Sequence, residues 1–178
     1  MPFPLPFVPL PSYKQGGRKF GSPRDGGVRK HAGCDLIAAQ WTEIFAIEDG
    51  VVHEAARHFY RGTWQISIRH SSGLVRYCEV QEEKWVKSLK VGQPVVAGQI
   101  IAHVGKMYRD SMLHFELYKN TTAGPLTQLS NKGFQRRKDL TDPAPLLDKL
   151  KANLLTVADA QATAPGAGMM SSVMSRGL

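Results

Sequence analysis

The chain has only two cysteines, Cys34 and Cys78, among its 178 residues. Two cysteines cannot build the disulfide framework that stabilises small secreted domains. Each cysteine immediately precedes an acidic residue, Asp35 or Glu79, and neighbouring side chains on a strand point to opposite faces. We therefore expect two buried thiols that point away from these carboxylates, with a single disulfide as the alternative in an oxidising compartment.

Long hydrophobic runs are also missing, since none approaches the ~20 residues that a membrane-spanning helix requires. No membrane span is therefore expected. The first twelve residues are apolar, but they lack a basic start and carry proline at nearly every second position. Proline prevents the helical apolar segment of a signal peptide. We expect residues 1–12 to form an extended, Pro-rich arm, and the chain to be made in the cytoplasm without a signal peptide.

The sequence lacks a recognisable nucleic-acid-binding motif, although Lys and Arg outnumber Asp and Glu by 23 to 15 and the net charge is +8. A positive chain favours an anionic partner such as nucleic acid, anionic lipid or a wall polymer. Because the basic residues are scattered, we expect no nucleic-acid partner. A basic surface that is merely solvated remains the alternative.

Short apolar–polar alternations separated by turn signals are present throughout the middle of the chain. They predict strands within residues 42–57, 62–70, 74–80, 91–101 and 112–119, with a turn at Asp49-Gly50. Short strands at this spacing predict a mainly β fold. Asp142 is placed to cap a helix that begins with Pro143. We expect one domain over 13–150, followed by a helix end and a low-complexity tail over 151–178.

Two segments carry candidate metal ligands. On a strand, His114 faces the same side as Met112 and Glu116, while the apolar residues between them anchor the opposite side. His31 and Asp35 are four residues apart with Gly33 between them, so both can turn toward one point. Imidazole and carboxylate bind zinc well, and a catalytic zinc keeps three protein ligands and a water. The spacing alone leaves a chance match open.

The segment His53–His58 comes close to the H-E-x-x-H zinc helix but misses it by one residue. Two ligands five residues apart do not share a helix face, and the segment lies in a predicted strand. We therefore exclude this type of zinc site.

The chain resembles the LytM/lysostaphin family of zinc endopeptidases, which cut peptidoglycan cross-links. The resemblance covers about residues 27–148. It is carried, in order, by Arg29-x-His31-x-Gly33-x-Asp35-Leu36, Asp49-Gly50-Val51-Val52, residues 66–77, residues 91–105, Leu113-His114-Phe115-Glu116-Leu117 and Asp142-Pro143. The resemblance implies a small antiparallel β-sheet groove (the duplicated hybrid motif) with a C-terminal helix. It also implies Zn2+ bound by His31, Asp35 and His114, and peptidoglycan as the substrate.

Two positions depart from the family's pattern. Its last motif usually reads His-x-His, and Met112 stands in place of the first histidine. Its central strand usually carries a histidine where this chain has Glu79. We expect Glu79 to share a strand face with Tyr77 and to act as general base, with an ordinary strand carboxylate as the alternative. Tyr77 is a candidate oxyanion donor or a groove-wall aromatic. Glu116 is a candidate for orienting a ligand imidazole, or for a cross-strand ion pair.

These departures leave two functions open. The first is an active zinc endopeptidase of peptidoglycan. The second is an inactive LytM-like domain that binds cell wall or a protein partner. Loss of function by drift would not keep all three ligand residues, which favours the enzyme. Without a signal peptide, we expect action in the periplasm or cell wall after delivery by a secretion or phage machine. An antibacterial effector with an immunity protein and a phage lysis or entry enzyme both fit.

Overall fold

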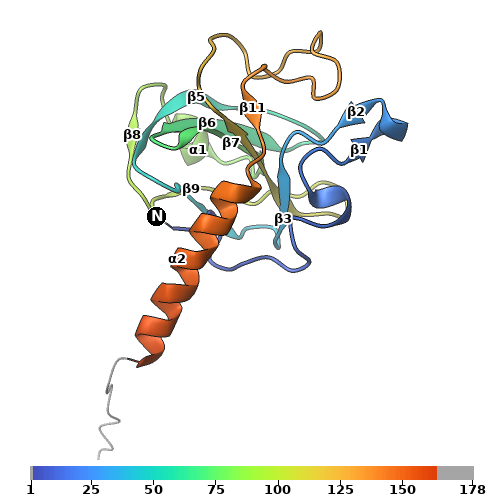
Figure 1. Cartoon of the computed structure of the whole chain (residues 1–178). Helices are drawn as coiled ribbons and strands as arrows, with labels where there is room; N and C mark the ends of the chain where they lie inside the picture. Colours follow the sequence, from blue (N-terminus) through green and yellow to red (C-terminus); the bar gives the residue numbers. More distant parts are fainter. Residues whose placement is uncertain (1, 164–178) are drawn as a thin grey trace, which may run out of the picture.

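An antiparallel sheet organises the molecule (Figure 1). The computed structural model describes residues 2–163, with side chains as far as residue 154, so the tail predicted for 164–178 lies outside the described residues. The strands are β1 (Pro23–Arg24), β2 (Arg29–Lys30), β3 (Cys34–Ile37), β4 (Glu43–Phe45), β5 (Gly50–His58), β6 (Trp64–His70), β7 (Gly73–Val80), β8 (Pro94–Val95), β9 (Ile100–His103), β10 (Met112–Tyr118) and β11 (Leu140–Thr141). The helices are α1 (Lys84–Ser88) and α2 (Ala144–Thr163), with short 3-10 turns at Gly16–Arg18 and Asp25–Gly27.

The main sheet has the strand order β11-β10-β7-β6-β5-β8, and β3 pairs with β10 on the same edge as β11. Two smaller pairs, β1–β2 and β4–β9, lie beside it. The mainly β fold with a C-terminal helix is therefore confirmed. Helix α1 and the short strands β1, β2 and β11 were not predicted.

One face of the main sheet is apolar. Its side chains alternate along β6, β7 and β10 and are fully buried, as the period of two requires. The central members of this core are Ile66, Ile68, Val75, Tyr77, Leu113 and Phe115. Burial of this face holds β10 rigidly in place, and the residues between the apolar positions must therefore face the other side.

The opposite face is polar and carries two rows of side chains. Residues directly opposite each other in antiparallel strands share a face, so the pairing register defines each row. The first row runs from β3 to β5 through Asp35, His114, Cys78, Gln65 and Arg57. The second runs through Glu116, Arg76, Ser67 and Glu54. The functional site lies on this face.

Both cysteines are free and buried, so the predicted thiols are confirmed and the alternative disulfide is not formed. Cys34 lies opposite Phe115 on the apolar face, as expected. The expected orientation of Cys78 is wrong, because Cys78 lies opposite His114 on the polar face. The cause is an irregularity at the next residue, Glu79, which interrupts the alternation of β7.

The apolar residues near the N-terminus pack against the sheet domain. Phe3 and Leu5 are each only 1% exposed and belong to the main core. The carbonyl of Pro4 accepts a hydrogen bond from the backbone N–H of Phe45 in β4. The first residues of this Pro-rich segment are therefore part of the domain core, and the segment bends at residues 4–7 and 10–11.

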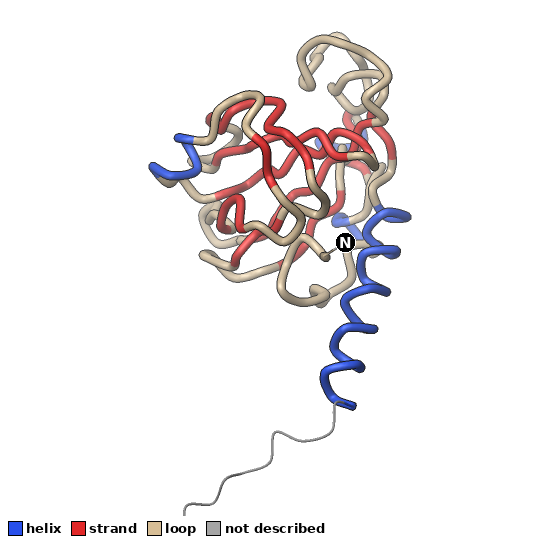
Figure 2. Tube along the Cα trace, turned by 90° about the vertical axis from the view of Figure 1, so that its left-hand side faces the viewer, coloured by secondary structure: helices blue, strands red, loops and turns tan. Residues whose placement is uncertain are grey.

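Helix α2 begins where the sequence predicted it. Asp142 Oδ1 accepts the backbone N–H of Ala144 at 2.9 Å, which caps the first turn. Leu147 and Leu150 are fully buried, whereas the later turns project away from the sheet in both views (Figures 1 and 2). Val157, the last apolar position in the sequence pattern of this helix, lies outside the described side chains. Within residues 2–163, no helix is long and apolar enough to cross a bilayer.

Candidate metal centre

Gly33 allows the chain between His31 and Asp35 to cross β10 at close range. A Cβ atom at Gly33 would lie 2.4 Å from the carbonyl oxygen of Phe115, so no larger residue fits without a backbone shift. The β3–β10 pairing then places Asp35 directly opposite His114. His31 approaches the same point from the segment between β2 and β3. The close approach at Gly33 thus brings His31 next to His114, although the two residues are 83 positions apart in the sequence.

Three donor atoms converge at this point. His31 Nε2 lies 3.0 Å from His114 Nδ1, and Asp35 Oδ1 lies 2.9 Å from the former and 2.8 Å from the latter. Zinc bound tetrahedrally at about 2.0–2.1 Å separates its ligand atoms by roughly 3.3 Å. An outward shift of roughly 0.4 Å per pair would accommodate the ion, so the predicted set His31, Asp35 and His114 fits zinc in both chemistry and geometry.

The outer nitrogen of each imidazole already has an acceptor. His31 Nδ1 lies 2.9 Å from the carbonyl oxygen of Lys19, and His114 Nε2 lies 3.1 Å from Glu116 Oε1. When these nitrogens donate, the inner nitrogens carry lone pairs that face each other and the Asp35 carboxylate. Three acceptors aimed at one another require a cation between them, and outer partners of this kind are typical of metal-bound histidine.

The pKa of Asp35 is lowered and the pKa of His114 is raised, and both shifts favour a positive charge between the three donor atoms. Burial alone would raise the pKa of Asp35, but hydrogen bonds from His114 and His31 outweigh it and hold the pKa well below its usual range. Burial alone would lower the pKa of His114, but hydrogen bonds to Asp35 and Glu116 raise it to about 10. A proton at this point and a metal ion are alternative occupants, because both neutralise the same carboxylate.

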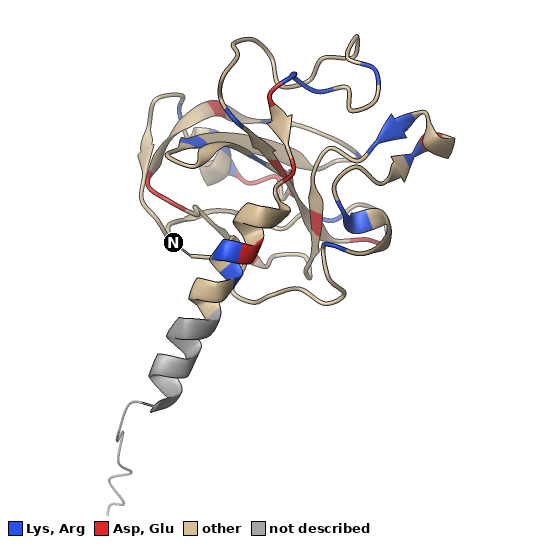
Figure 3. Ribbon diagram, viewed as in Figure 1, with Lys and Arg blue, Asp and Glu red and all other residues tan. Residues whose placement is uncertain are grey.

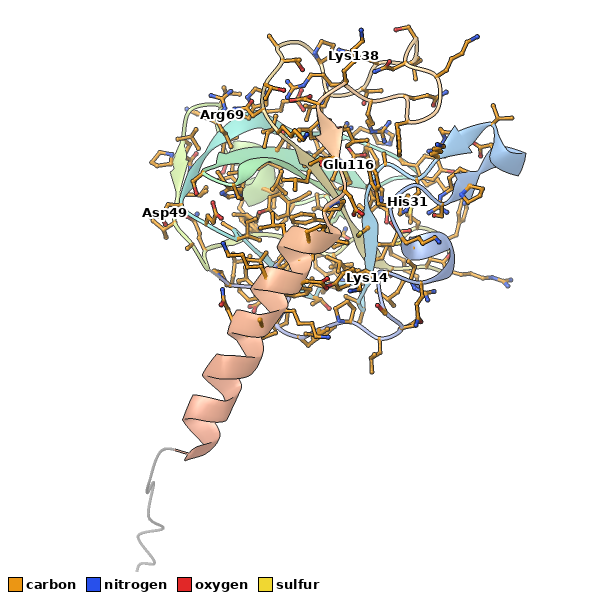
Figure 4. The ribbon with its side chains drawn as sticks, in the orientation of Figure 1. Lys14, His31, Asp49, Arg69, Glu116 and Lys138 are labelled. Carbon is orange, nitrogen blue, oxygen red and sulfur yellow. The ribbon has the colours of Figure 1, made fainter. Side chains whose placement is uncertain are left out.

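Glu116 connects the cluster to two arginines. Its carboxylate is fully buried and accepts bonds from Arg136 Nε at 2.7 Å, Arg76 Nη1 at 3.4 Å and the hydroxyl of Tyr118. Burial alone would raise its pKa, but the charge of Arg136 and the bond from His114 hold the pKa well below its usual value. His31 and Glu116 both contact His114, and their labels lie near each other in Figure 4.

A cavity of about 670 Å³ opens over this polar face. All three donor residues line it, together with Glu79 and a set of basic and aromatic side chains. The basic and aromatic members are Arg24, Arg29, Arg57, His58, Phe59, Tyr60, Arg76 and Arg136. Basic residues lie on the β1–β2 hairpin and on the loop after β10, on two sides of the site (Figure 3).

Comparison with known proteins identifies the chain by family. The description "Peptidase family M23" matches residues 29–124, which is more than half of the chain and includes the whole donor set. The chain belongs to peptidase family M23. It is therefore a metallopeptidase by family.

Several M23-type proteins are similar to this chain. A peptidoglycan DD-endopeptidase, ShyC, of Vibrio cholerae is 32% identical over 101 residues, which cover 55% of this chain and 22% of that protein. The chain thus spans about a fifth of the length of this curated relative. The catalytic domain of the antimicrobial peptidase lysostaphin from Staphylococcus simulans has a TM-score of 0.54 and 26% identity, with 73% of this chain and 89% of that chain covered. The structure of LytU has a TM-score of 0.54 and 25% identity, covering 79% and 92% of the two chains.

Glu79 of this M23 domain lines the cavity from an irregular position in β7. Trp64 pairs with Val80 and Gln65 with Cys78, so Glu79 is an extra residue without a cross-strand partner, which is a β-bulge. Its φ of +63° is in the left-handed region, which is strained for a residue with a side chain. Gly105 packs against the bulge, where a Cβ would lie 2.8 Å from the Glu79 carbonyl oxygen.

The Glu79 carboxyl group is buried and incompletely bonded. The residue is 8% exposed, and its Oε2 atom is buried with no hydrogen-bond partner among the described residues. Burial raises the pKa of Glu79 to about 7, and the nearby Asp35 carboxylate acts in the same direction. A dication in the cluster would lower this pKa again, which favours the ionised form near neutral pH.

The expectation that Tyr77 and Glu79 share a strand face is wrong. The bulge at Glu79 shifts the alternation, so Tyr77 faces the apolar core and is fully buried. Its hydroxyl lies 3.0 Å from His70 Nε2 and 3.4 Å from the backbone nitrogen of Ile47. Burial raises its pKa above the usual range. Tyr77 does not line the cavity, and its hydroxyl has no access to a substrate carbonyl there.

Met112 and Glu116 differ in how closely they approach the cluster. Met112, which replaces a histidine of the family's pattern, pairs with Ile37 at the start of β10 and does not line the cavity. Glu116 contacts the ligand imidazole of His114, as the shared strand face predicted, and its contacts to Arg76 and Arg136 also make it a buried ion-pair residue.

Several lining residues were missed by the sequence analysis. Arg24 forms an ion pair with Asp35 at 3.2 Å, and the ring of Phe59 stacks on the ring of His114 at a centroid distance of 6.2 Å. His58 and Tyr60 line the cavity from the end of β5 and the turn that follows. None of these residues belongs to a spaced motif. For the residues at the end of β5, the one feature that pointed to them was the predicted strand over this region, because the end of that strand lies at the site.

Proposed function

We propose that this chain is a zinc-dependent endopeptidase that hydrolyses peptide cross-links of bacterial peptidoglycan. Family membership and the names of the similar proteins support the substrate class. The observation that carries the proposal is Glu79, a buried carboxyl with an unbonded oxygen, in the same cavity as three converging zinc-type donors. A natural substrate of this kind lies outside the cytoplasm, so action in the periplasm or cell wall is part of the proposal.

His31, Asp35 and His114 would hold the zinc, and Lys19 and Glu116 would keep the two imidazoles in the required tautomer through their outer nitrogens. Zinc, when bound, supplies Lewis acidity to the scissile carbonyl and lowers the pKa of a water molecule. Arg24 holds the second carboxylate oxygen of Asp35 at 3.2 Å, which leaves Oδ1 free to point at the ion.

Glu79 takes the role of the general base. Its Oε2 accepts a proton from the attacking water, and the resulting acid returns that proton to the nitrogen of the leaving amine. This single carboxyl replaces the proton handling that the family's pattern assigns to histidines, because neither Met112 nor Tyr77 reaches the cavity. The strained bulge is consistent with a side chain that is held in place for chemistry at some expense of stability.

The test compares wild-type protein with Glu79→Gln, His114→Ala and the exposed β4 control Glu43→Gln. Metal content is measured after purification, and purified peptidoglycan is assayed for new peptide ends by mass spectrometry. We expect one equivalent of zinc in wild type, Glu79→Gln and Glu43→Gln, and none in His114→Ala. Release of peptide ends should fall by about 10²–10⁴-fold in Glu79→Gln and remain normal in Glu43→Gln.

Two results would overturn the proposal. Intact peptidoglycan with zinc-loaded wild-type protein would support the alternative of an inactive domain that binds wall or a partner. Full activity of Glu79→Gln would show that Glu79 is not the general base, although the protein would still be a zinc-dependent enzyme. Delivery by a secretion or phage machine and the existence of an immunity protein stay predictions.

A further inference from the structure

The polar face of the sheet connects the metal-type cluster to Arg57. Four cross-strand pairs form one continuous row, Asp35–His114, His114–Cys78, Cys78–Gln65 and Gln65–Arg57. Arg57 is therefore three strands from His114, which is about 14 Å at roughly 4.8 Å per strand. Both residues line the same cavity, so a ligand that occupies the cavity can contact both.

Arg57 has the most exposed side chain among the five arginines that line the cavity. Its side chain is 51% exposed, whereas those of Arg76 and Arg136 are 4% and 11% exposed and bond to Glu116. Arg57 uses only Nη2, which lies 3.2 Å from both carboxylate oxygens of Glu54. Among the described residues, Nε and Nη1 of Arg57 have no hydrogen-bond partner, and they remain available to a ligand.

The second row of side chains on the polar face, which ends beside Arg57 at Glu54, also has more positive than negative charge once the arginines that bond to it are counted. Three arginines, Arg57, Arg76 and Arg136, face two carboxylates, Glu54 and Glu116. Two of these guanidinium groups share the single buried carboxylate of Glu116. Charge that is partly removed from water and not fully paired favours binding of an anion from solution.

We propose that Arg57 binds a free carboxylate on the peptide stem of the substrate, two to four residues from the scissile amide. An extended peptide advances about 3.3–3.4 Å per residue, so about 14 Å corresponds to roughly four residues. Because the long side chain of Arg57 can lean toward the cluster, the separation can shorten to roughly two residues. A guanidinium fork pairs well with a carboxylate and poorly with a neutral carboxamide. This inference rests on the proposed function and adds a substrate preference to it.

A free carboxylate and a carboxamide have nearly the same shape, so charge alone would distinguish them at this position. Arg57 would therefore make the enzyme select non-amidated cross-links. A bridge built only of neutral residues would not use this contact.

The experiment uses soluble cross-linked stem-peptide dimers of one sequence, in which each free carboxylate is replaced in turn by a carboxamide. Wild type, Arg57→Gln and Arg69→Gln are assayed as full-length, zinc-loaded chains, and kcat and KM are measured from the released amine. Arg69 is the matched control because it lies on neighbouring β6, pairs with His53, does not line the cavity and is labelled far from His31 and Glu116 (Figure 4).

We expect one carboxamide, two to four residues from the scissile amide, to raise the KM of wild type about tenfold with little change in kcat. Arg57→Gln should raise KM for the carboxylate dimer by a similar factor and should no longer distinguish the two dimers. Arg69→Gln should behave as wild type.

The inference is overturned if wild type cleaves all dimers with equal kcat/KM, or if Arg57→Gln keeps the discrimination. It is also overturned if Arg29→Gln, a second cavity-lining variant assayed in the same way, is the one that removes the discrimination. In each of these cases wild type still cleaves peptide, so the proposed function survives. Absence of cleavage of every dimer would instead contradict the proposed function.

Discussion

Replacement of Glu79 by glutamine should change how the stability of the metal-free protein depends on pH. Burial raises the pKa of this carboxyl from 4.5 to about 7. A carboxyl whose pKa is raised in the folded protein makes its full contribution to the free energy of unfolding at pH values below the pKa that it has in the unfolded chain. The contribution is lost as pH rises through the folded pKa, because the unfolded chain ionises more readily.

A difference between 4.5 and about 7 corresponds to about 3 kcal/mol once the pH exceeds the folded pKa. Glutamine has nearly the same shape and cannot ionise, so the variant does not suffer this loss. We expect the free energy of unfolding of Glu79→Gln to match that of wild type near pH 4.5 and to exceed it by about 3 kcal/mol at pH 8. For a domain of this size, that difference corresponds to roughly 6–12 °C in Tm.

Urea unfolding between pH 4.5 and 8.5 in the presence of a chelator measures the effect, with Glu43→Gln on the exposed side of β4 as control. Added zinc should reduce the difference in free energy of unfolding between wild type and Glu79→Gln, because a nearby dication lowers the pKa of the Glu79 carboxyl. If the stability curves of wild type and Glu79→Gln run parallel across this pH range, Glu79 is not desolvated and the reasoning fails.

Three further substitutions test the surroundings of the site. Glu116→Gln leaves Arg76 and Arg136 without their buried carboxylate, so we expect a loss of about 3–5 kcal/mol in urea unfolding. Its metal affinity should fall about 10–100-fold in chelator competition, and unchanged affinity would show that the bond to His114 does not hold the ring. Leu5→Ala should cost about 2–5 kcal/mol in thermal unfolding, whereas Leu10→Ala, at a position 85% exposed, should cost almost nothing; equal effects would contradict burial of the N-terminal segment. Gly33→Ala places a Cβ 2.4 Å from the Phe115 carbonyl oxygen and should weaken metal binding, and a variant with normal affinity would contradict the need for close approach there.

Period-two alternation was sufficient to predict β10 and the face that carries His114, whereas the grouping of His31, Asp35 and His114 into one metal site was implied by the family resemblance. Leu113 and Phe115 are completely buried, which turns His114 toward the polar face as the sequence predicted. The cap at Asp142 was equally local and was predicted correctly. These features depend on neighbours a few residues away, so a single sequence contains them.

The face of Tyr77 could not be predicted in the same way. The alternation of β7 breaks at Glu79, where one extra residue is inserted opposite Trp64 and Gln65. Nothing in Tyr77-Cys78-Glu79 signals a bulge, because the residue with positive φ is a glutamate and not a glycine. Its support comes from Gly105, whose backbone nitrogen bonds to the Glu79 carbonyl at 2.7 Å from another part of the chain. A one-residue shift moved Tyr77 from the predicted site into the core and turned Cys78 toward the site.

The partners of the basic run Arg136-Arg137-Lys138 could not be predicted from the sequence either. Arg136 bonds to the buried carboxylate of Glu116, and Arg137 pairs with Asp139, whereas Lys138 is exposed in its loop (Figure 4). Adjacent residues of one charge thus have different roles, because their partners are set by tertiary contacts. Of these three basic residues, only Lys138 is exposed, so the run overstates the positive surface that this loop offers to a partner. The case for an anionic substrate group rests on Arg57, whose exposed side chain lies in the same cavity as the metal-type cluster.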